Sequence, residues 1–180
     1  TASGDFMAEA DATLAINVSS YVIRDIRNGI LQTYPIVKIG TQYWMKEDLQ
    51  AAYYNDSRSM PLGKTLGGGE SYFKWADCDA CFYNGEAVLT EKLAPLDWKL
   101  PAPNDWSRLK EYVGENASAL KKADAWNSDV YSATNETGFG IQPRGLLLER
   151  ENKTTLVNAN SSTAYWVYNS TQKQLDTVVM

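Results

Sequence analysis

The chain has 180 residues, a length that fits one domain with a sizeable hydrophobic core. Seventeen basic and 22 acidic residues give a net charge of −5, which argues against binding to nucleic acid or to an anionic membrane surface. The sequence has no histidine, and this excludes Ser-His-Asp and Cys-His catalysis as well as histidine-dependent zinc sites.

The first half of the chain predicts a tail, two β segments and a long loop. Residues 1–12 are small and polar, as in a tail or linker. Apolar residues then alternate with polar ones from Leu14 to Val18, which predicts a strand over residues 13–19. Two β-rich runs at residues 34–39 and 42–45 are separated by Gly40-Thr41 and predict a hairpin. Residues 55–70 contain three consecutive glycines and predict a loop.

The second half predicts helices followed by short strands. A helix is expected to begin after residues 101–103 (Pro-Ala-Pro) and to end at Gly114, because Trp106, Leu109 and Val113 have helical spacing. A short second helix is expected over residues 117–123. Short β-like runs at residues 145–148, 154–157 and 164–168 predict strands joined by long loops. No apolar run approaches the roughly 18 residues that span a bilayer, so direct membrane insertion is not expected.

Four motifs follow one another along the chain. Residues 22–29 (VIRDIRNG) precede residues 34–49 (YPIVKIGTQYWMKEDL). Residues 98–109 (WKLPAPNDWSRL), residues 138–145 (GFGIQPRG) and Tyr165-Trp166 come later. In this order and spacing the motifs resemble those of the Fibrobacter succinogenes major paralogous domain family, over about residues 21–170.

The resemblance implies an α+β domain with a C-type lectin-like fold, in which two helices lie beside a small antiparallel sheet with long irregular loops. It implies a domain over residues 21–180 after an N-terminal extension of residues 1–20 that carries one strand. It also implies an extracellular or outer-surface protein of Bacteroidetes-type bacteria. Because the chain ends pair in lectin-like folds, residues 14–18 are expected to pair with residues 175–179. A strand appended from an upstream domain, or exchanged between subunits, is the competing interpretation.

Two sets of residues invite a metal or redox interpretation. Cys78 and Cys81 are the only thiols, and no second pair or histidine completes a zinc shell. In a secreted chain a local disulfide between them is expected, with two free thiols as the alternative. The calcium-dependent sugar site of lectin-like domains is not expected, because Arg144 stands where a metal-binding oxygen is needed. The sequence therefore predicts no metal and no cofactor, and it places Arg144 on the surface or in a structural ion pair.

Eleven tyrosines and six tryptophans, against four phenylalanines, favour a binding module. The tryptophans of the family-like blocks are expected in the core; these are Trp44, Trp75, Trp98 and Trp106. Residues 165–169 alternate, so one face of that segment is expected to be exposed. We predict that the ligand-binding residues lie in this late region; they are Asn160, Tyr165, Tyr168 and Asn169.

Asparagine is also unusually frequent before Ser or Thr. Asn-x-Ser/Thr occurs seven times, although composition predicts about two occurrences by chance. A eukaryotic glycoprotein would explain this pattern, but the bacterial resemblance favours surface loops that are rich in Asn, Ser and Thr.

Together these features predict a non-enzymatic adhesion module that recognises a glycan or a host or surface protein, for example as part of a pilus tip. Catalysis by paired carboxylates is not expected, because adjacent acidic side chains in a strand diverge. One alternative is a structural subunit that polymerises with neighbouring subunits through its terminal strands. Another is a hypervariable receptor-binding protein of a diversity-generating system.

Overall fold

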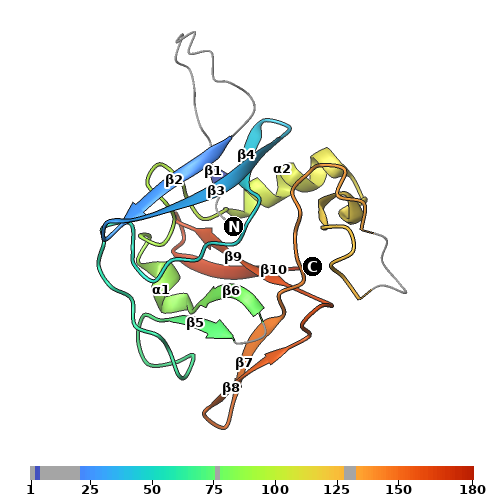
Figure 1. Ribbon diagram of the computed structural model, residues 1–180. Coiled ribbons are helices and arrows are strands. Elements are labelled where there is room, and N and C mark those ends of the chain that lie inside the picture. The colour runs from blue at the N-terminus through green and yellow to red at the C-terminus, as the bar shows by residue number, and fades with distance from the viewer. Residues whose placement is uncertain (1–2, 5–20, 76–77, 128–132) are drawn as a thin grey trace.

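The computed structural model in Figure 1 describes residues 3–4, 21–75, 78–127 and 133–180. One four-stranded sheet has the order β1 (Ser3–Gly4), β4 (Gln42–Met45), β3 (Ile30–Ile39) and β2 (Val22–Arg27). Three antiparallel pairs follow. They are β5 (Tyr72–Trp75) with β6 (Cys78–Tyr83), β7 (Leu146–Arg150) with β8 (Lys153–Val157), and β9 (Ala164–Asn169) with β10 (Gln174–Val179).

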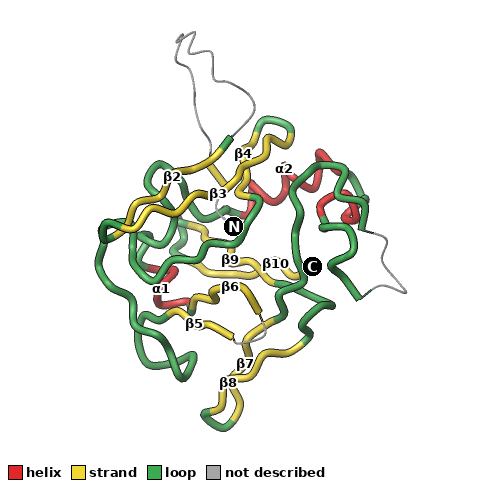
Figure 2. Tube along the Cα trace, in the orientation of Figure 1, coloured by secondary structure: helices red, strands yellow, loops and turns green. Residues whose placement is uncertain are grey.

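Helices make up a small part of the molecule, as Figure 2 shows. They are α1 (Gly85–Leu89), α2 (Pro103–Val113) and a 3₁₀ turn, η1 (Ala117–Leu120). Helix α2 confirms the predicted helix. Pro103 begins it, the Asp105 carboxylate accepts the Ala102 N–H at 2.8 Å, and Gly114 ends it with φ 61°. The predicted second helix is only the short 3₁₀ turn.

The predicted fold class is wrong. The sequence motifs implied an α+β domain of C-type lectin-like type with two helices beside one small sheet, whereas most of the regular structure is in small separate antiparallel sheets. The error arises because the fold was inferred from the resemblance of the motifs, whereas the local signals identify strands without specifying which strands pair. Here the late strands form isolated pairs instead of joining a central sheet.

Individual strands agree with the sequence pattern. The predicted hairpin is confirmed as β3 and β4, with Ile39 opposite Gln42 across the Gly40-Thr41 turn. The runs predicted in the last third are confirmed as β7, β8 and β9. A further hairpin joins β2 to β3 through Asn28-Gly29. Both turn residues have positive φ (48° and 76°), as a two-residue type I′ turn requires.

The core consists of two clusters on opposite faces of the β9–β10 pair. One cluster contains Trp44 and Trp106, whose ring centroids are 5.2 Å apart, together with Tyr165. The other contains residues of β3, β4 and α1, and Trp166 and Leu175 pack against it. Trp44 and Trp106 are therefore core residues as predicted, whereas Trp75 and Trp98 are half-buried.

Asparagines occupy many of the tight turns. Five of them have φ between 48° and 64°, in the left-handed region that asparagine tolerates better than most residues. They are Asn28, Asn135, Asn152, Asn158 and Asn160. Three of these begin an Asn-x-Ser/Thr sequence, so turn geometry accounts for part of the excess.

Two predictions concern residues 5–20, which lie outside the described part of the chain. They are the strand over residues 13–19 and its pairing with residues 175–179, which form most of β10 and pair with β9. The division of the chain at residues 20 and 21 stays a prediction. Among the described helices, none is long and apolar enough to cross a membrane, and the longest has 11 residues.

Candidate functional site

A cavity of about 490 Å³ lies between β6, β7 and the β9–β10 pair. Its walls are mainly apolar, and each of these strands contributes to them: Phe82 from β6, Leu147 from β7, Trp166 from β9 and Val179 from β10. Small-molecule sites in proteins typically have volumes of roughly 300–1,000 Å³, with apolar walls and a few polar groups. The cavity is therefore the candidate binding site.

Tyr83 fixes the wall formed by β6. Its hydroxyl accepts the Ala51 N–H at 2.7 Å and lies 3.0 Å from the carbonyl oxygens of Leu49 and Ala51. Burial raises the pKa of the Tyr83 phenol well above its usual value, so the group stays neutral. The Trp166 indole donates to the Tyr83 carbonyl at 2.7 Å and ties β9 to the same wall.

Asn84 holds the glycine-rich loop next to the cavity. Its side-chain oxygen accepts the N–H groups of Ser71 and Ala87, and thereby caps helix α1. Its amide donates to the carbonyl oxygens of Leu66 and Gly69 at 3.0 and 2.8 Å. The predicted loop is thus anchored at both sides of its three glycines by one buried side chain.

One ion pair supplies the charged groups that line the cavity. Arg144 Nε lies 3.3 Å from Asp48 Oδ2, and about a fifth of each side chain is exposed. This bears out the interpretation of Arg144 as a structural ion-pair partner. Both groups are partly accessible, so a ligand that enters the cavity can meet a guanidinium and a carboxylate as well as apolar side chains.

Gly145 sets the path of the chain between this ion pair and β7. Its φ is 81°, and a Cβ there would lie 2.7 Å from the Val157 carbonyl oxygen. Its N–H donates to the Ser162 carbonyl at 2.7 Å. Because backbone packs directly on backbone, only glycine fits, and β7 is held against the loop that leads into β9.

The two predicted ligand-binding tyrosines are buried, with exposed fractions of 7% for Tyr165 and 8% for Tyr168. Tyr165 packs on Trp106 with ring centroids 5.7 Å apart. Tyr168 donates its hydroxyl to Glu91 Oε1 at 2.7 Å, and this hydrogen bond raises the pKa of the phenol. The exposed aromatic face expected for this segment is therefore absent, since both faces of β9 are covered.

The structure does not bring the four predicted residues into one surface. Asn160 is exposed in the turn before β9, where its N–H donates to the Pro143 carbonyl. Asn169 ends β9 and hydrogen-bonds Gln172 through both its amide groups. The length of β9 separates these two asparagines, and their contact with a ligand stays a prediction.

The cysteine prediction also stays open. Cys78 and Cys81 both belong to β6, but the side chain of Cys78 lies outside the described residues. Cys81 is buried and contributes to the cavity wall. Within the described part of the chain, no group of three His, Cys, Asp or Glu residues is arranged to hold a metal ion.

Of the four predicted ligand-binding residues, only Tyr165 is among those that line this cavity, and sequence reasoning missed most of the other lining residues. Most are ordinary apolar side chains, and they come from segments between Asp48 and Val179. The one local signal was the run of three leucines in β7, at residues 146–148. All three line the cavity, although Leu148 is 39% exposed.

The family model of the Fibrobacter succinogenes major domain matches residues 37–180. Every residue that lines the cavity falls within the match, whereas β2 and the first part of β3 precede it. No curated protein and no solved structure matches the chain.

Proposed function

Since the chain belongs to the Fibrobacter succinogenes major domain family, we propose that it is a non-enzymatic binding module that acts in adhesion at the outer cell surface. A surface appendage such as a pilus tip is a suitable setting. The ligand is a glycan or a surface protein that inserts an apolar group into the cavity. No cofactor takes part in this binding.

The cavity is the observation that carries the proposal. It combines a volume of about 490 Å³ with largely apolar walls and one partly exposed ion pair. Its walls are fixed by hydrogen bonds of Tyr83, Asn84 and Trp166, so little ordering is required when a ligand binds. This arrangement suits a ligand with an apolar part and a polar end near Asp48 and Arg144.

The proposed binding site replaces the late aromatic surface as the main contact region. Ala164, Tyr165 and Trp166 all line the cavity, so β9 still contributes to binding. No comparison supports the wider C-type lectin-like relation that the motifs implied, and the proposal does not depend on it.

Two variants, each with one alanine replaced by leucine, test the proposal. Ala164 is half-buried and lines the cavity, so Ala164→Leu fills part of it; Ala159→Leu makes the same change at an exposed position outside it. Glycan and protein arrays are probed with wild type and both variants. We expect Ala164→Leu to bind the ligands of wild type at least ten-fold more weakly, and Ala159→Leu to bind them with unchanged affinity.

Equal binding by the three proteins contradicts the proposed site. Thermal melting of each variant accompanies the arrays, because Ala164→Leu adds bulk beside β10 and a misfolded variant also loses binding. If Ala164→Leu is unfolded, the smaller change Ala164→Val takes its place.

A structural subunit is the second candidate, and the free edge of β10 favours it. Thr163 and Met180 exchange backbone hydrogen bonds at 3.0 and 2.9 Å, which sets the register of β9 with β10. Leu175, Thr177 and Val179 therefore direct their backbone groups away from β9, and no described strand pairs with them. A sizing experiment with and without residues 1–20 tests assembly: loss of oligomers on deletion supports it, and a monomer in both cases contradicts it.

A further inference from the structure

Strand β2 ends the four-stranded sheet and has an outward-facing backbone edge. The Ile36 N–H donates to the Tyr21 carbonyl at 2.9 Å, which sets the hydrogen-bonded register of β2 with β3. By alternation, Val22, Arg24 and Ile26 direct their N–H and C=O groups away from β3. No strand among the described residues pairs with this edge.

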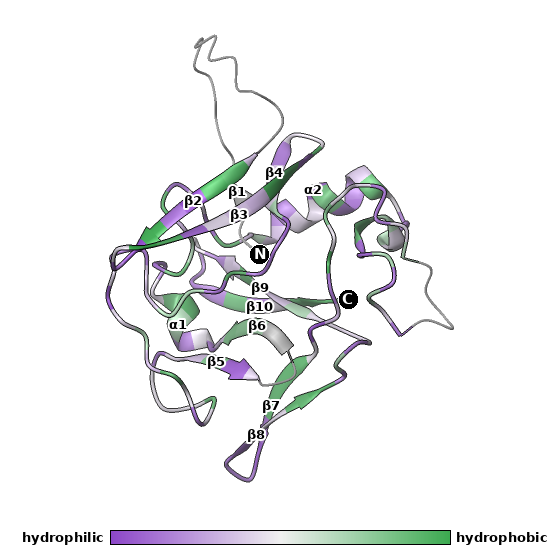
Figure 3. Ribbon diagram, in the orientation of Figure 1, coloured by the Kyte–Doolittle hydropathy of each residue, from purple (hydrophilic) through white to green (hydrophobic). Residues whose placement is uncertain are grey.

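The side chains beside this edge are unusually apolar for a solvent face. The same three residues alternate with buried ones, and Val22 and Ile26 are 44% and 61% exposed. Leu31, opposite Ile26 on β3, is 46% exposed. Figure 3 shows green at both ends of β2 with purple between them. Soluble proteins normally protect such edges, so an exposed apolar edge strand indicates a surface that pairs with another strand.

Arg24 is the one charged side chain on this outer face, at its centre between Val22 and Ile26. In the described part of the chain no acidic residue forms an ion pair with it. If two copies paired antiparallel through β2, so that Val22 of each lay opposite Ile26 of the other, Arg24 would lie opposite Arg24 of the other copy. Like charges directly opposite each other destabilise a sheet. The edge therefore disfavours self-association and suits a strand with a negative charge.

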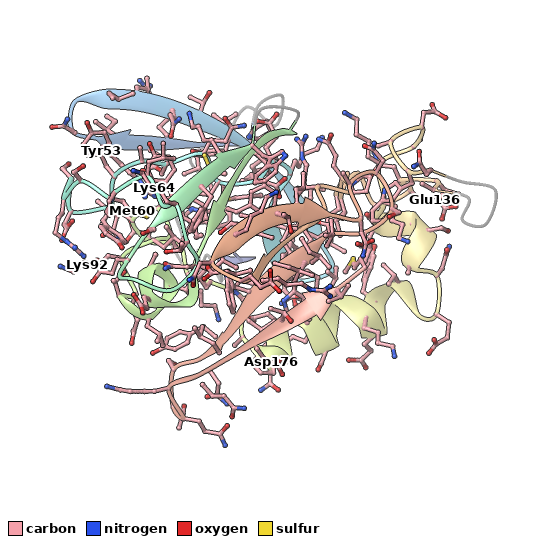
Figure 4. The ribbon with its side chains drawn as sticks, turned by 90° about the horizontal axis from the view of Figure 1, so that it is seen from below. Tyr53, Met60, Lys64, Lys92, Glu136 and Asp176 are labelled. Atoms are coloured by element: carbon pink, nitrogen blue, oxygen red, sulfur yellow. The ribbon has the colours of Figure 1, made fainter. Side chains whose placement is uncertain are left out.

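The edge is held rigidly from its inner face. Arg27 Nε lies 3.0 and 2.9 Å from the two oxygens of Asp25, and both residues are buried. Arg27 also donates from Nη1 to the Tyr53 carbonyl at 2.7 Å and from Nη2 to the Leu93 carbonyl at 3.0 Å. Figure 4 shows Tyr53 next to the β2–β3 hairpin, and Asp176 of β10 on the opposite side of the molecule.

From these features we propose that the β2 edge binds an extended segment of another protein by strand addition. The segment carries an acidic residue with an apolar residue two positions before it and another two positions after it. Backbone hydrogen bonds to Val22, Arg24 and Ile26 supply the pairing, the acidic side chain lies opposite Arg24, and the apolar side chains cover the two flanking residues. This surface is separate from the cavity, so it can function whether or not the cavity binds a ligand.

The probe is the peptide Ser-Val-Thr-Glu-Thr-Val-Ser, and the control peptide has Lys in place of Glu. Amide chemical shifts and hydrogen exchange of the full chain are followed by NMR at peptide concentrations up to about 1 mM, the weak end of the affinity scale. We expect the Glu peptide to shift the amides of β2 and to slow exchange at Val22, Arg24 and Ile26. The Lys peptide is expected to bind at least five-fold more weakly.

The variant Arg24→Glu provides the decisive control, since it changes an exposed side chain outside the core. It should reverse the preference and bind the Lys peptide better than the Glu peptide. A Glu peptide with N-methyl groups on the edge that faces β2 should not bind, whereas methylation of its other edge should be tolerated. The cavity variant Ala164→Leu should bind the Glu peptide as wild type does.

Three outcomes overturn this proposal. They are no change in the β2 amides at about 1 mM peptide, equal binding of the two peptides, and slow exchange at all three outward amides in the free protein. The last result would show that the chain itself already covers the edge.

Discussion

The buried pair of Asp25 and Arg27 offers the sharpest test of how strand β2 is attached to the rest of the molecule. Arg27 is 3% exposed, and its guanidinium satisfies both oxygens of Asp25 and the carbonyls of Tyr53 and Leu93. Arg27→Met removes the charge but keeps much of the side-chain volume. It leaves a buried carboxylate and two carbonyls without their donor, and breaking a buried ion pair in this way typically costs about 3–5 kcal/mol.

The double variant distinguishes the charge from the packing. Asp25→Leu combined with Arg27→Met replaces both charges with apolar groups, and this exchange is often close to neutral when the volume is retained. We expect Arg27→Met to lower the free energy of unfolding by about 4 kcal/mol and the double variant by about 2 kcal/mol, because the two carbonyls still lack donors.

Urea denaturation followed by tryptophan fluorescence measures both values, and the m-value shows whether unfolding stays cooperative. A loss below about 1 kcal/mol for Arg27→Met would refute the reasoning, since it would mean that water or another group satisfies Asp25. A double variant that loses as much stability as Arg27→Met alone would refute it as well, because removal of the Asp25 charge would then relieve none of the cost.

Three further predictions concern residues that stabilise the core and the surroundings of the cavity. Burial, and then a hydrogen bond to a carboxylate, raise the pKa of Tyr54 to about 12. The stability that the neutral phenol contributes is therefore complete below about pH 10 and is lost as the pH rises toward 12. In urea titrations at alkaline pH, the free energy of unfolding of Tyr54→Phe should fall less steeply with pH than that of wild type. Asn84→Ala removes four hydrogen bonds and should lower the free energy of unfolding, measured by urea denaturation, by about 3 kcal/mol. Asn84→Asp keeps the two accepted bonds and should lower it less; equal losses would contradict the role given to the side-chain oxygen. Gly145→Ala places a Cβ 2.7 Å from the Val157 carbonyl at positive φ and should lower the melting temperature by several degrees, about 2 kcal/mol, whereas Gly67→Ala, with open space around it, should leave the temperature unchanged.

The sequence predicted the elements whose signals are local. The hairpin around Gly40, the helix that ends at Gly114 and the strands β7, β8 and β9 each combine a repeating apolar pattern with a turn or cap residue. Strand β5 and helix α1 were missed because they are four and five residues long, too short to show a period, and neither is paired with a second β-rich run across a glycine turn as β4 is. The pairs β2–β3, β5–β6, β7–β8 and β9–β10 were not predicted, although their strands follow one another along the chain. Asn28-Gly29 is the local turn signal that could have identified the first of these pairs.

The cavity could not be predicted because it depends on contacts between segments that are distant in the sequence. Its apolar lining residues resemble any core residues in the sequence, and they become a site only where β6, β7 and β9 meet. The exposure of Tyr165 and Tyr168 was mispredicted because alternation along β9 does not reveal that both faces are covered. Trp106 covers one face, and Glu91 receives the hydroxyl of the side chain on the other.

A crystal structure of the protein with a ligand from the array screen tests the central claim most directly. We predict electron density for an apolar group of the ligand between β6, β7 and β9, within van der Waals distance of Phe82, Leu147 and Trp166. Density over Asn160 or Asn169 with the cavity still free of ligand would contradict the account.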